Sequence, residues 1–258
     1  MSILQAIVLG VLEGLAEFLP ISSTAHLLIA SEILKVADSE FTKTFISSLR
    51  LGAIMSVALV YFYTIIKNRS LILKMAAAFL PTAIIGLAAY GLIRQVLMEN
   101  LISISITLIL GGIFIILLEN YFSKRDKALK TDLKDISYKQ AFLIGVFQSL
   151  AVIPGLSRSA ATIMGGLYMG ISRKVIVEFS FIAAIPVMIA ATGYDFFRTP
   201  LEFSQNEWLV WSLGVLASFI TAIAGIKFFL NYIKNNNFKI FGWYRIIIGS
   251  LVILWQLL

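Results

Sequence analysis

The sequence predicts an all-α, polytopic membrane protein with about six transmembrane helices and two re-entrant helical hairpins, arranged as an inverted-topology repeat. Of the 258 residues, 59% are hydrophobic and 14% are charged, whereas a typical soluble domain carries about 25% charged residues. Apolar segments long enough to cross a bilayer recur along the chain, and two further apolar stretches are interrupted at proline. Cysteine is absent, which excludes disulfides and thiolate metal ligands.

The first repeat is expected to cover residues 1–121. It opens with an apolar stretch, residues 3–34, that is interrupted at Leu19-Pro20. Proline removes a backbone donor and clashes with the preceding turn, so this stretch should form a hairpin of two short helices. Three spans of transmembrane length follow the hairpin, at about 45–66, 72–93 and 101–120.

The second repeat is expected to cover residues 140–258, after a cytoplasmic linker of mixed charge at residues 122–139. Its first stretch, residues 140–171, is interrupted at Pro154-Gly155 and should form the second hairpin. Three spans follow again, at about 175–194, 208–230 and 241–258. The chain therefore contains the same plan twice, a broken hairpin followed by three crossings.

The two broken stretches match each other at an offset of 135 residues. The matches are Gly10-Val11 with Gly145-Val146, Leu15-Ala16 with Leu150-Ala151, and the run Ser22-Ser23-Thr24-Ala25 with Ser157-Arg158-Ser159-Ala160. If each hairpin leaves the membrane on the side that it entered, three crossings put the second hairpin on the opposite face. The result is an inverted repeat whose two hairpin tips meet near the midplane.

The basic residues are distributed unevenly between the two sides of this topology. Fifteen would lie on one side: Lys67, Arg69, Lys74, Lys124, Arg125, Lys127, Lys130, Lys134, Lys139, Arg173, Lys174, Lys227, Lys234, Lys239 and Arg245. Four would lie on the other: Lys35, Lys43, Arg94 and Arg198. Cytoplasmic loops carry the excess of lysine and arginine, so the first hairpin is expected to open outward and the second inward. The net charge of +7 thus sets the topology and does not indicate nucleic-acid binding.

Glu13 and Glu17 lie four residues apart in the first hairpin and share one helix face, with Cβ atoms about 5–6 Å apart. Two carboxylates in hydrocarbon are costly and repel each other, unless a cation or a proton lies between them. A pair that snorkels to the interface is one interpretation. A divalent-cation site or a general base is the other, and oxygen ligands without cysteine favour Mg²⁺ or Ca²⁺ over zinc.

His26 is the only histidine of the chain and lies three residues after Ser23. A lone histidine is usually a structural residue. Here the spacing puts a hydroxyl beside a titratable base, which is the arrangement that activates a serine nucleophile. We expect Ser23 to attack with His26 as base and later as acid, and the reversed roles stay open.

Arg158 is the only charged residue of the second hairpin, and it stands in the run 154–162 that begins a half-helix after a Pro-Gly break. Free N–H groups, the positive end of the helix dipole and nearby hydroxyls make such a run a nest for anions. Arginine adds a planar fork suited to phosphate oxygens. The alternative is that Arg158 neutralises Glu13 or Glu17 across the repeat.

Carboxylates, a Ser–His pair and an arginine nest at the midplane supply what phosphoryl transfer needs, namely positioning and neutralisation of charge. The surrounding apolar helices suit a substrate that carries its own lipid tail. Inverted repeats of broken helices are also the plan of secondary transporters, so a transporter is the alternative, and a phosphatase that also flips its lipid product is a third interpretation. The oligomeric state stays open, with a homodimer among the states that the sequence allows.

The two hairpin sequences resemble those of undecaprenyl-diphosphatases of the bacitracin-resistance type. The motifs that carry the resemblance are Glu13-Gly-Leu-Ala-Glu-Phe-Leu-Pro-Ile-Ser-Ser-Thr-Ala-His26, Pro154-Gly-Leu-Ser-Arg-Ser-Ala-Ala-Thr162, Glu178-Phe-Ser-Phe-Ile-Ala-Ala-Ile-Pro186 and Tyr244-Arg-Ile-Ile-Ile-Gly249. The resemblance therefore covers essentially the whole chain. Three positions depart from the family pattern: Ala25 and Ala160 stand where glycine is common, and Arg50 stands where glutamine is expected.

The resemblance implies hydrolysis of undecaprenyl diphosphate to the monophosphate at the outer face of the bacterial inner membrane, which recycles the carrier lipid for peptidoglycan synthesis and confers bacitracin resistance. It also implies a divalent cation, Mg²⁺ or Ca²⁺, which we expect Glu13 and Glu17 to hold. The expected catalytic residues are Ser23, His26, Glu17 and Arg158, with either the serine or the histidine as nucleophile. The residues expected to bind substrate are Ser22, Thr24, Ser157, Ser159 and Thr162.

Overall fold

Six helices in the described part of the chain are long and apolar enough to cross a bilayer. The computed structural model describes residues 1–97, 100–123, 132–198 and 203–258. The six candidate spans are Glu40–Lys67, Arg69–Ala89, Leu101–Phe122, Arg173–Phe197, Gln205–Tyr232 and Lys239–Leu257. They coincide with the six predicted spans, so the prediction of an all-α, polytopic membrane protein is confirmed.

The described residues form helices in both halves of the chain. In the first half they are α1 (Ile3–Ala16), α2 (Ser23–Ile33), α3 (Glu40–Ser48), α4 (Arg50–Lys67), α5 (Arg69–Leu97) and α6 (Leu101–Ser123). In the second half they are the 3₁₀ turn η1 (Leu133–Asp135), α7 (Tyr138–Ser149), the 3₁₀ turn η2 (Leu150–Val152), α8 (Arg158–Tyr168), α9 (Arg173–Arg198), α10 (Gln205–Tyr232) and α11 (Lys239–Leu257). The helices are apolar on their outer faces as well as on their inner ones. Leu59, Leu87 and Leu117, for example, are exposed on the lateral surface. Such residues suit a lipid environment.

The first hairpin consists of α1 and α2, separated by a turn at residues 17–22 that contains Pro20. Ser2 and Gln5 form a capping box at the start of α1, so their side chains satisfy N–H groups that the first turn leaves free. Ser22 turns the chain into α2 with a φ of 74°. The helix break thus falls at the predicted proline.

The second hairpin consists of α7, η2 and α8, and it repeats local details of the first at the same offset of 135 residues. Gln140 completes a capping box at the start of α7, and Ser157, with a φ of 70°, precedes α8. The side-chain amide of Gln140 donates to the Met169 carbonyl at 3.3 Å, as that of Gln5 donates to the Leu34 carbonyl at 2.9 Å. Each glutamine therefore ties the start of its hairpin to the end.

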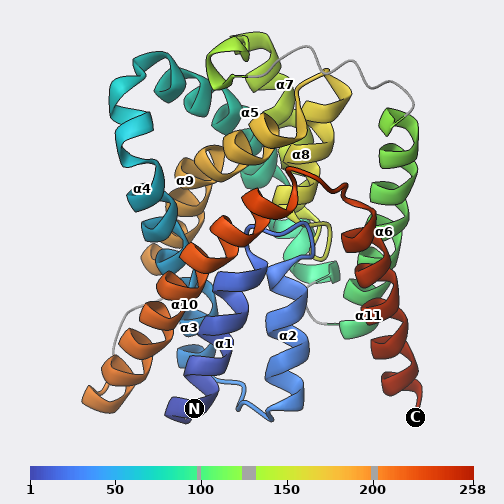
Figure 1. Ribbon diagram of the computed structural model, residues 1–258. Helices are drawn as coiled ribbons and strands as arrows, with labels where there is room; N and C mark the ends of the chain where they lie inside the picture. The colour runs from blue at the N-terminus through green and yellow to red at the C-terminus, as the bar shows by residue number, and fades with distance from the viewer. Residues whose placement is uncertain (98–99, 124–131, 199–202) are drawn as a thin grey trace.

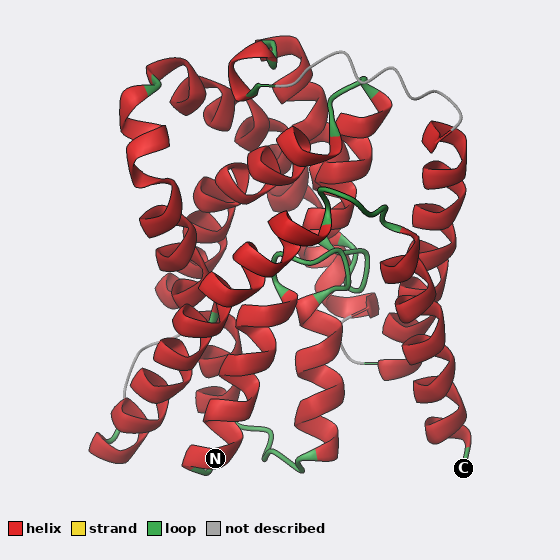
Figure 2. Cartoon of the chain, in the orientation of Figure 1, coloured by secondary structure: helices red, strands yellow, loops and turns green. Residues whose placement is uncertain are grey.

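The two hairpins enter the molecule from opposite ends (Figure 1). α1 and α2 extend from the end that carries both termini, and α7 and α8 extend from the other end. Their turns meet near the centre, where the loops of both hairpins lie together (Figure 2), and a hydrogen bond between Ser159 and Leu19 joins them directly. Neither hairpin traverses the molecule, so each begins and finishes at one end.

Close packing fixes the first helix of each hairpin against a long helix of the other half, α1 against α10 and α7 against α5. A Cβ added at Gly14 would overlap the Ser218 carbonyl and the Thr221 hydroxyl of α10, and one added at Gly145 would overlap the Ala78 carbonyl of α5. Small residues let helix backbones approach in this way inside membranes. The height of each hairpin turn is therefore set by the packing of its first helix.

The predicted basic side is described only in part. Lys124, Arg125, Lys127 and Lys130 lie outside the described residues, as do the side chains of Arg94 and Arg198. The end of α4 and the starts of α5 and α7, which bring further basic residues, lie together at one end of the molecule (Figure 1). Arg245 does not belong there. Its assignment to that side is wrong, because its side chain is completely buried against α6 and the two hairpin turns.

The first predicted span is divided into two helices. α3 ends at Ser48 and α4 begins at Arg50, with Leu49 between them. The Trp211 indole donates to the Ser48 hydroxyl at 2.7 Å, and the Ser218 hydroxyl donates to the Leu49 carbonyl at 2.9 Å. These donors on α10 stabilise the junction, which puts half-buried Arg50 at the start of α4.

Candidate active site

The turn of the first hairpin brings a carboxylate and a hydroxyl together. Glu17 caps the C-terminal end of α1, and Ser23 is the first residue of α2. The Ser23 hydroxyl donates a hydrogen bond of 2.5 Å to Glu17 Oε2. Oxygen–oxygen distances of about 2.5–2.7 Å are typical of a hydroxyl that donates to an ionised acceptor. Glu17 is therefore placed to accept the Ser23 proton.

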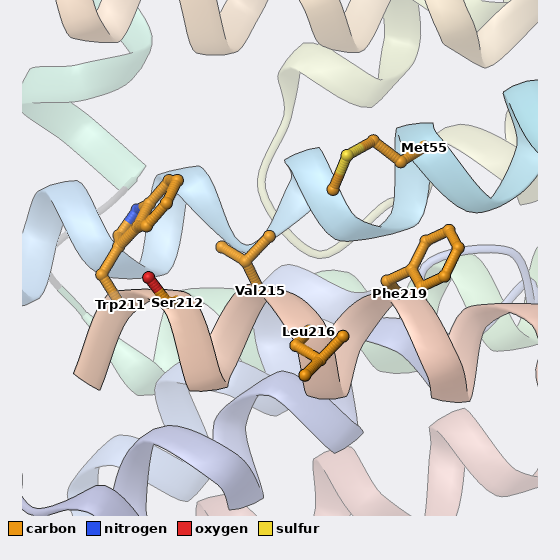
Figure 3. Close-up of a pocket in the computed structure, with 6 residues that line it drawn as sticks. All are labelled: Met55, Trp211, Ser212, Val215, Leu216 and Phe219. Atoms are coloured by element: carbon orange, nitrogen blue, oxygen red, sulfur yellow. The ribbon is translucent and has the colours of Figure 1, made fainter. Parts of the chain in front are cut away.

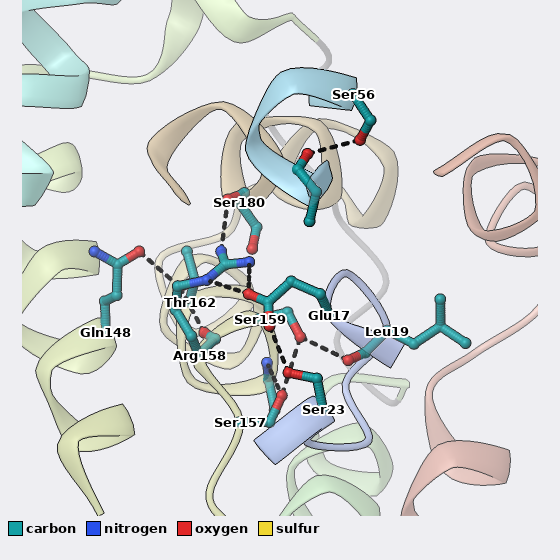
Figure 4. A network of polar contacts seen from close by, with 12 residues as sticks. Glu17, Leu19, Ser23, Ser56, Gln148, Ser157, Arg158, Ser159, Thr162 and Ser180 are labelled. Atoms are coloured by element: carbon teal, nitrogen blue, oxygen red, sulfur yellow. Dashed lines mark hydrogen bonds and ion pairs between the residues drawn. The ribbon is translucent and has the colours of Figure 1, made fainter. Parts of the chain in front are cut away.

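Arg158, the first residue of α8, pairs with Glu17 between the two hairpins (Figure 4). Its Nη2 and Nε donate to Glu17 Oε1 at 3.1 and 3.4 Å, and its Nη1 donates to the Ser180 carbonyl of α9 at 3.0 Å. Both charged side chains are only 10% exposed. The interpretation that Arg158 pairs with a glutamate of the other repeat is therefore confirmed.

The serines beside Arg158 connect the two turns. Ser159 donates to the Leu19 carbonyl of the first hairpin at 2.8 Å, and its hydroxyl lies 3.0 Å from that of Ser157. Ser157 accepts from the Ala160 N–H at 3.3 Å and so caps α8. Ser157 and Ser159 thus have structural contacts in addition to the substrate contacts that the sequence predicts for them.

The other residues predicted to bind substrate lie around the turns. Thr162 is completely buried; its hydroxyl contacts the Arg158 carbonyl at 2.7 Å and Gln148 Oε1 at 3.3 Å. It therefore supports the first turn of α8 from within the protein. Ser22 caps the N-terminal end of α2, and Thr24 is half-buried in the first turn of that helix.

His26 makes its hydrogen bonds away from Ser23. Its Nδ1 is 2.7 Å from the Ser22 carbonyl and its Nε2 is 2.8 Å from the Tyr244 hydroxyl, and the His26 and Tyr244 rings lie parallel with centroids 5.5 Å apart. A carbonyl only accepts, so Nδ1 carries the proton and Nε2 of the neutral ring accepts from Tyr244. The structure therefore shows no hydrogen bond between Ser23 and His26, because the ring folds back on the preceding turn of α2 while the Ser23 hydroxyl turns to Glu17.

Glu13 lies one turn before Glu17 on α1 and is completely buried. Neither of its carboxylate oxygens has a hydrogen-bond partner among the described residues. Glu17, Arg50, Arg158 and the Ser23 hydroxyl are close enough to act on it electrostatically. A buried carboxylate without donors needs compensation by a proton or a cation.

The donor set around Glu13 fits a hard divalent cation in kind, since Mg²⁺ and Ca²⁺ both prefer oxygen ligands. Among the residues that the structure describes, no three His, Cys, Asp or Glu side chains form a metal-binding group. The chain offers the carboxylates of Glu13 and Glu17. Mg²⁺ is commonly held by one or two carboxylates together with water and substrate phosphates. These residues therefore fit a metal that binds along with a phosphate substrate.

Two residues of α11 belong to this region, although the sequence pattern assigns a functional role to neither. Tyr244 donates to His26, and Arg245 donates to the Pro20 carbonyl of the first turn at 3.3 Å and to the Leu156 carbonyl of the second at 3.0 Å. One signal was present, because an arginine inside an apolar span indicates a functional site in membrane proteins. Its place near the start of the span is also typical of a residue at the membrane surface, which is why the sequence predicts it on the basic side.

An apolar groove of about 300 Å³ lies between α4 and α10 (Figure 3). Its lining residues are Met55, Trp211, Ser212, Val215, Leu216 and Phe219. Met55 and Leu216 are about half exposed, so the groove belongs to the lateral surface of the helical shell. None of the predicted site residues lines it, and it is separate from the polar cluster at the hairpin turns.

The fold and the polar cluster define a polytopic membrane protein with a charged, largely buried site where two broken hairpins meet. The cluster combines a hydroxyl, a carboxylate that accepts its proton, and a guanidinium at the N-terminal end of α8. These groups are suited to phosphoryl transfer, in which positioning and neutralisation of charge provide most of the catalysis.

Comparison with known proteins identifies the family. Residues 6–251 match the family described as bacitracin resistance protein BacA. Proteins named undecaprenyl-diphosphatase are similar over nearly their full length: one from Aquifex aeolicus is 46% identical over 245 residues, which are 95% of each chain. One from a Sulfurihydrogenibium species is 42% identical over 99% of this chain and 100% of its own. One from Flavobacterium johnsoniae is 40% identical over 98% of this chain and 96% of its own. The chain belongs to the BacA family.

Proposed function

We propose that this protein hydrolyses undecaprenyl diphosphate to undecaprenyl phosphate and inorganic phosphate. The names of the three relatives support this substrate, and they give no support to the transporter alternative. Apolar helices around the site suit a substrate with a long lipid tail. Release of the monophosphate recycles the carrier lipid for peptidoglycan synthesis, and this recycling is the basis of bacitracin resistance.

The observation that carries the proposal is the pair of contacts on Glu17. One carboxylate oxygen accepts from Ser23 and the other is paired with Arg158. A guanidinium binds phosphate oxygens as readily as it binds a carboxylate. A phosphate that displaces part of the Arg158–Glu17 contact therefore comes to lie next to the Ser23 hydroxyl.

In the first step, Ser23 Oγ attacks the terminal phosphorus and the bond from that phosphorus to the bridging oxygen breaks. Undecaprenyl phosphate leaves with the bonding electron pair, and the Ser23 proton passes to Glu17. The 2.5 Å hydrogen bond supports Glu17, instead of His26, as the base. In the second step a water molecule attacks the phosphoserine and the phosphorus–Oγ bond breaks. Ser23 Oγ regains its proton from Glu17, and the water oxygen and its two protons leave in the inorganic phosphate.

Charge neutralisation comes from the second hairpin. Arg158 stands at the N-terminal end of α8, where backbone N–H groups and the helix dipole also favour an anion. Its Nη1 contact with the Ser180 carbonyl holds the guanidinium in place while the other nitrogens face Glu17. These groups stabilise the phosphoryl group as its bond to the leaving group breaks.

A divalent cation is part of the proposal. Glu13, whose oxygens have no partner among the described residues, would hold it together with Glu17. When bound, the cation would neutralise charge on the two phosphates of the substrate.

We further propose that the protein lies in the bacterial inner membrane, with the first hairpin opening to the outer side. The uneven distribution of lysine and arginine in the sequence supports this orientation. The diphosphate would then enter from the outer side, and its lipid tail would pass between the helices into the bilayer.

The nucleophile can be identified by trapping. Purified protein is mixed briefly with undecaprenyl diphosphate that is radiolabelled in the terminal phosphate, and the labelled peptide is mapped. Label that survives acid and lies on Ser23 supports the proposal, because phosphoserine is stable in acid. Acid-labile label on His26 would give the histidine the nucleophilic role. Absence of phosphate release from this lipid would reject the proposed function itself.

A further inference from the structure

The guanidinium of Arg245 contacts the backbone of three separate segments. Its Nη1 donates to the Pro20 carbonyl of the first turn at 3.3 Å and to the Leu156 carbonyl of the second turn at 3.0 Å. Its Nη2 donates to the Gly155 carbonyl at 2.7 Å, and its Nε donates to the Leu108 carbonyl of α6 at 3.3 Å. One planar group therefore joins both hairpin turns to the wall of the helical shell.

Arg245 carries its charge without a counter-ion in the part of the chain that the structure describes. Its side chain is completely buried, and none of the ion pairs among the described residues includes it. Burial of an uncompensated guanidinium is costly, whereas an apolar side chain of similar length would fill the same space without that cost. We therefore expect the N–H donors of the guanidinium to be the reason for an arginine at this position.

The carbonyls that Arg245 binds include those that the helix breaks release. Pro20, Gly155 and Leu156 lie in the turns between helices, where no helical N–H is available to their oxygens. Inside an apolar shell such carbonyls need another donor. Because one rigid, planar guanidinium supplies donors to both turns, it also fixes the distance between them.

We propose that Arg245 is a positioning residue that holds Ser23 and Arg158 in register by clamping the two turns. Pro20 precedes Ser23 by three residues, and Leu156 precedes Arg158 by two. The inference rests on the proposed phosphatase function. A misplacement of about 1 Å in an active site can lower a rate about a hundredfold. Loss of the clamp therefore acts on kcat and leaves every charge that contacts substrate in place.

The packing of α11 against α6 offers a second way to disturb the clamp. A Cβ added at Gly111 of α6 would overlap Nη2 of Arg245. The variant Gly111→Ala thus displaces the guanidinium without changing Arg245 itself. A matched control is Arg173→Met, which removes another arginine at the start of α9, where its guanidinium pairs with completely buried Glu119.

The test compares Arg245→Met, Arg245→Lys, Gly111→Ala and Arg173→Met as purified proteins. For Arg245→Met, phosphate release from undecaprenyl diphosphate should show a kcat lowered about a hundredfold with KM nearly unchanged. Arg245→Lys should recover part of the rate, and Gly111→Ala should lower kcat in the same way. Arg173→Met should lower the apparent Tm and keep a kcat close to that of the wild type.

Hydrogen exchange provides a readout that does not depend on activity. Arg245→Met should speed exchange in peptides that cover residues 17–22 and 153–157, and Arg173→Met should not. The proposal is overturned if Arg245→Met keeps its kcat, if only its KM changes, or if exchange in both turns stays at the wild-type rate. If the wild type releases no phosphate, the proposed function fails, and the exchange rates still decide whether Arg245 clamps the turns.

Discussion

The two carboxylate oxygens of Glu17 make two different contacts, each suited to a different chemical role. Oε2 accepts from Ser23 and Oε1 is paired with Arg158, so proton acceptance and charge neutralisation are coupled at a single side chain. His26, which the sequence suggests as the base, is instead bonded to the Ser22 carbonyl and to Tyr244. In the proposed mechanism, activation of the serine therefore depends on a carboxylate of the first hairpin.

Replacement of the nucleophile tests this assignment. Ser23→Ala removes the attacking oxygen, so phosphate release should fall at least about a thousandfold. Ser31→Ala is the matched control, because Ser31 stands on the same helix and its buried hydroxyl has no hydrogen-bond partner among the described residues. Its turnover should equal that of the wild type. Turnover by Ser23→Ala above a tenth of the wild-type rate would exclude Ser23 as the nucleophile.

Substitution of Glu13 tests the proposed cation. Glu13→Gln keeps the shape of the side chain and removes its charge, so the concentration of Mg²⁺ or Ca²⁺ needed for half-maximal phosphate release should rise about 10- to 100-fold. The control is Glu32→Gln, an exposed residue of α2. Titration with each metal after treatment with a chelator measures the effect. An unchanged metal requirement in Glu13→Gln would assign the cation to other ligands.

Sequence patterns predict which residues belong to the site better than they predict the contacts between those residues. The helix breaks at Pro20 and Pro154 were evident because proline cannot continue a helix, and charges inside apolar stretches had to be paired. The partners of Ser23 and Arg245 depend on side-chain directions at the turns, which residue spacing does not give. An arginine near the start of an apolar span has the same pattern whether it faces water or the interior.

At the scale of helices, each half-helix that carries the site starts at a serine in the left-handed region. Ser22 precedes α2 with a φ of 74° and Ser157 precedes α8 with a φ of 70°. This conformation costs about 1–2 kcal/mol in a residue other than glycine, and capping of the helix offsets part of that cost. The turn places the next residue at Glu17: Ser23 donates to it within the first hairpin, and Arg158 pairs with it from the second.

The contact of α1 with α10 should control activity from outside the site. A Cβ on Gly10 would overlap the Gly214 carbonyl, so Gly10→Ala should push α1, whose C-terminal end is capped by Glu17, away from its place. We expect a loss of about 1–3 kcal/mol of stability together with a lower kcat. Gly193→Ala is the control, since nothing lies within 4 Å of its added Cβ. Thermal unfolding and phosphate release measure both effects, and equal behaviour of the two variants would contradict this account of the packing.

The extents of the long helices were predictable because bilayer thickness fixes the length of an apolar span. The division of the first span between α3 and α4 could not be predicted from the sequence. It depends on donors from Trp211 and Ser218 on α10, which are distant in the sequence from Leu49. Long-range contacts of this kind leave no periodic pattern.

At the scale of the whole molecule, the orientation in the membrane decides where the substrate enters. The chain has no cysteine, so single cysteines can be introduced into an otherwise unchanged protein. Asp38 and Lys139 are exposed. The segment between α2 and α3, which contains Asp38, lies at the end that carries the termini, and α7, whose first turn contains Lys139, begins at the other end (Figure 1). In intact cells a membrane-impermeant maleimide should label Asp38→Cys and should label Lys139→Cys only after lysis. The reverse labelling would place the first hairpin on the cytoplasmic side.

In the proposed mechanism, an arginine from one hairpin and a carboxylate from the other form a single phosphoryl-transfer site. The most direct test is the rate at which purified Arg158→Met protein releases phosphate from undecaprenyl diphosphate, relative to the wild type. Methionine keeps most of the length of the side chain and removes the charge that contacts Glu17. We expect a rate lower by at least about a thousandfold in a folded protein. A rate within tenfold of the wild type would contradict it.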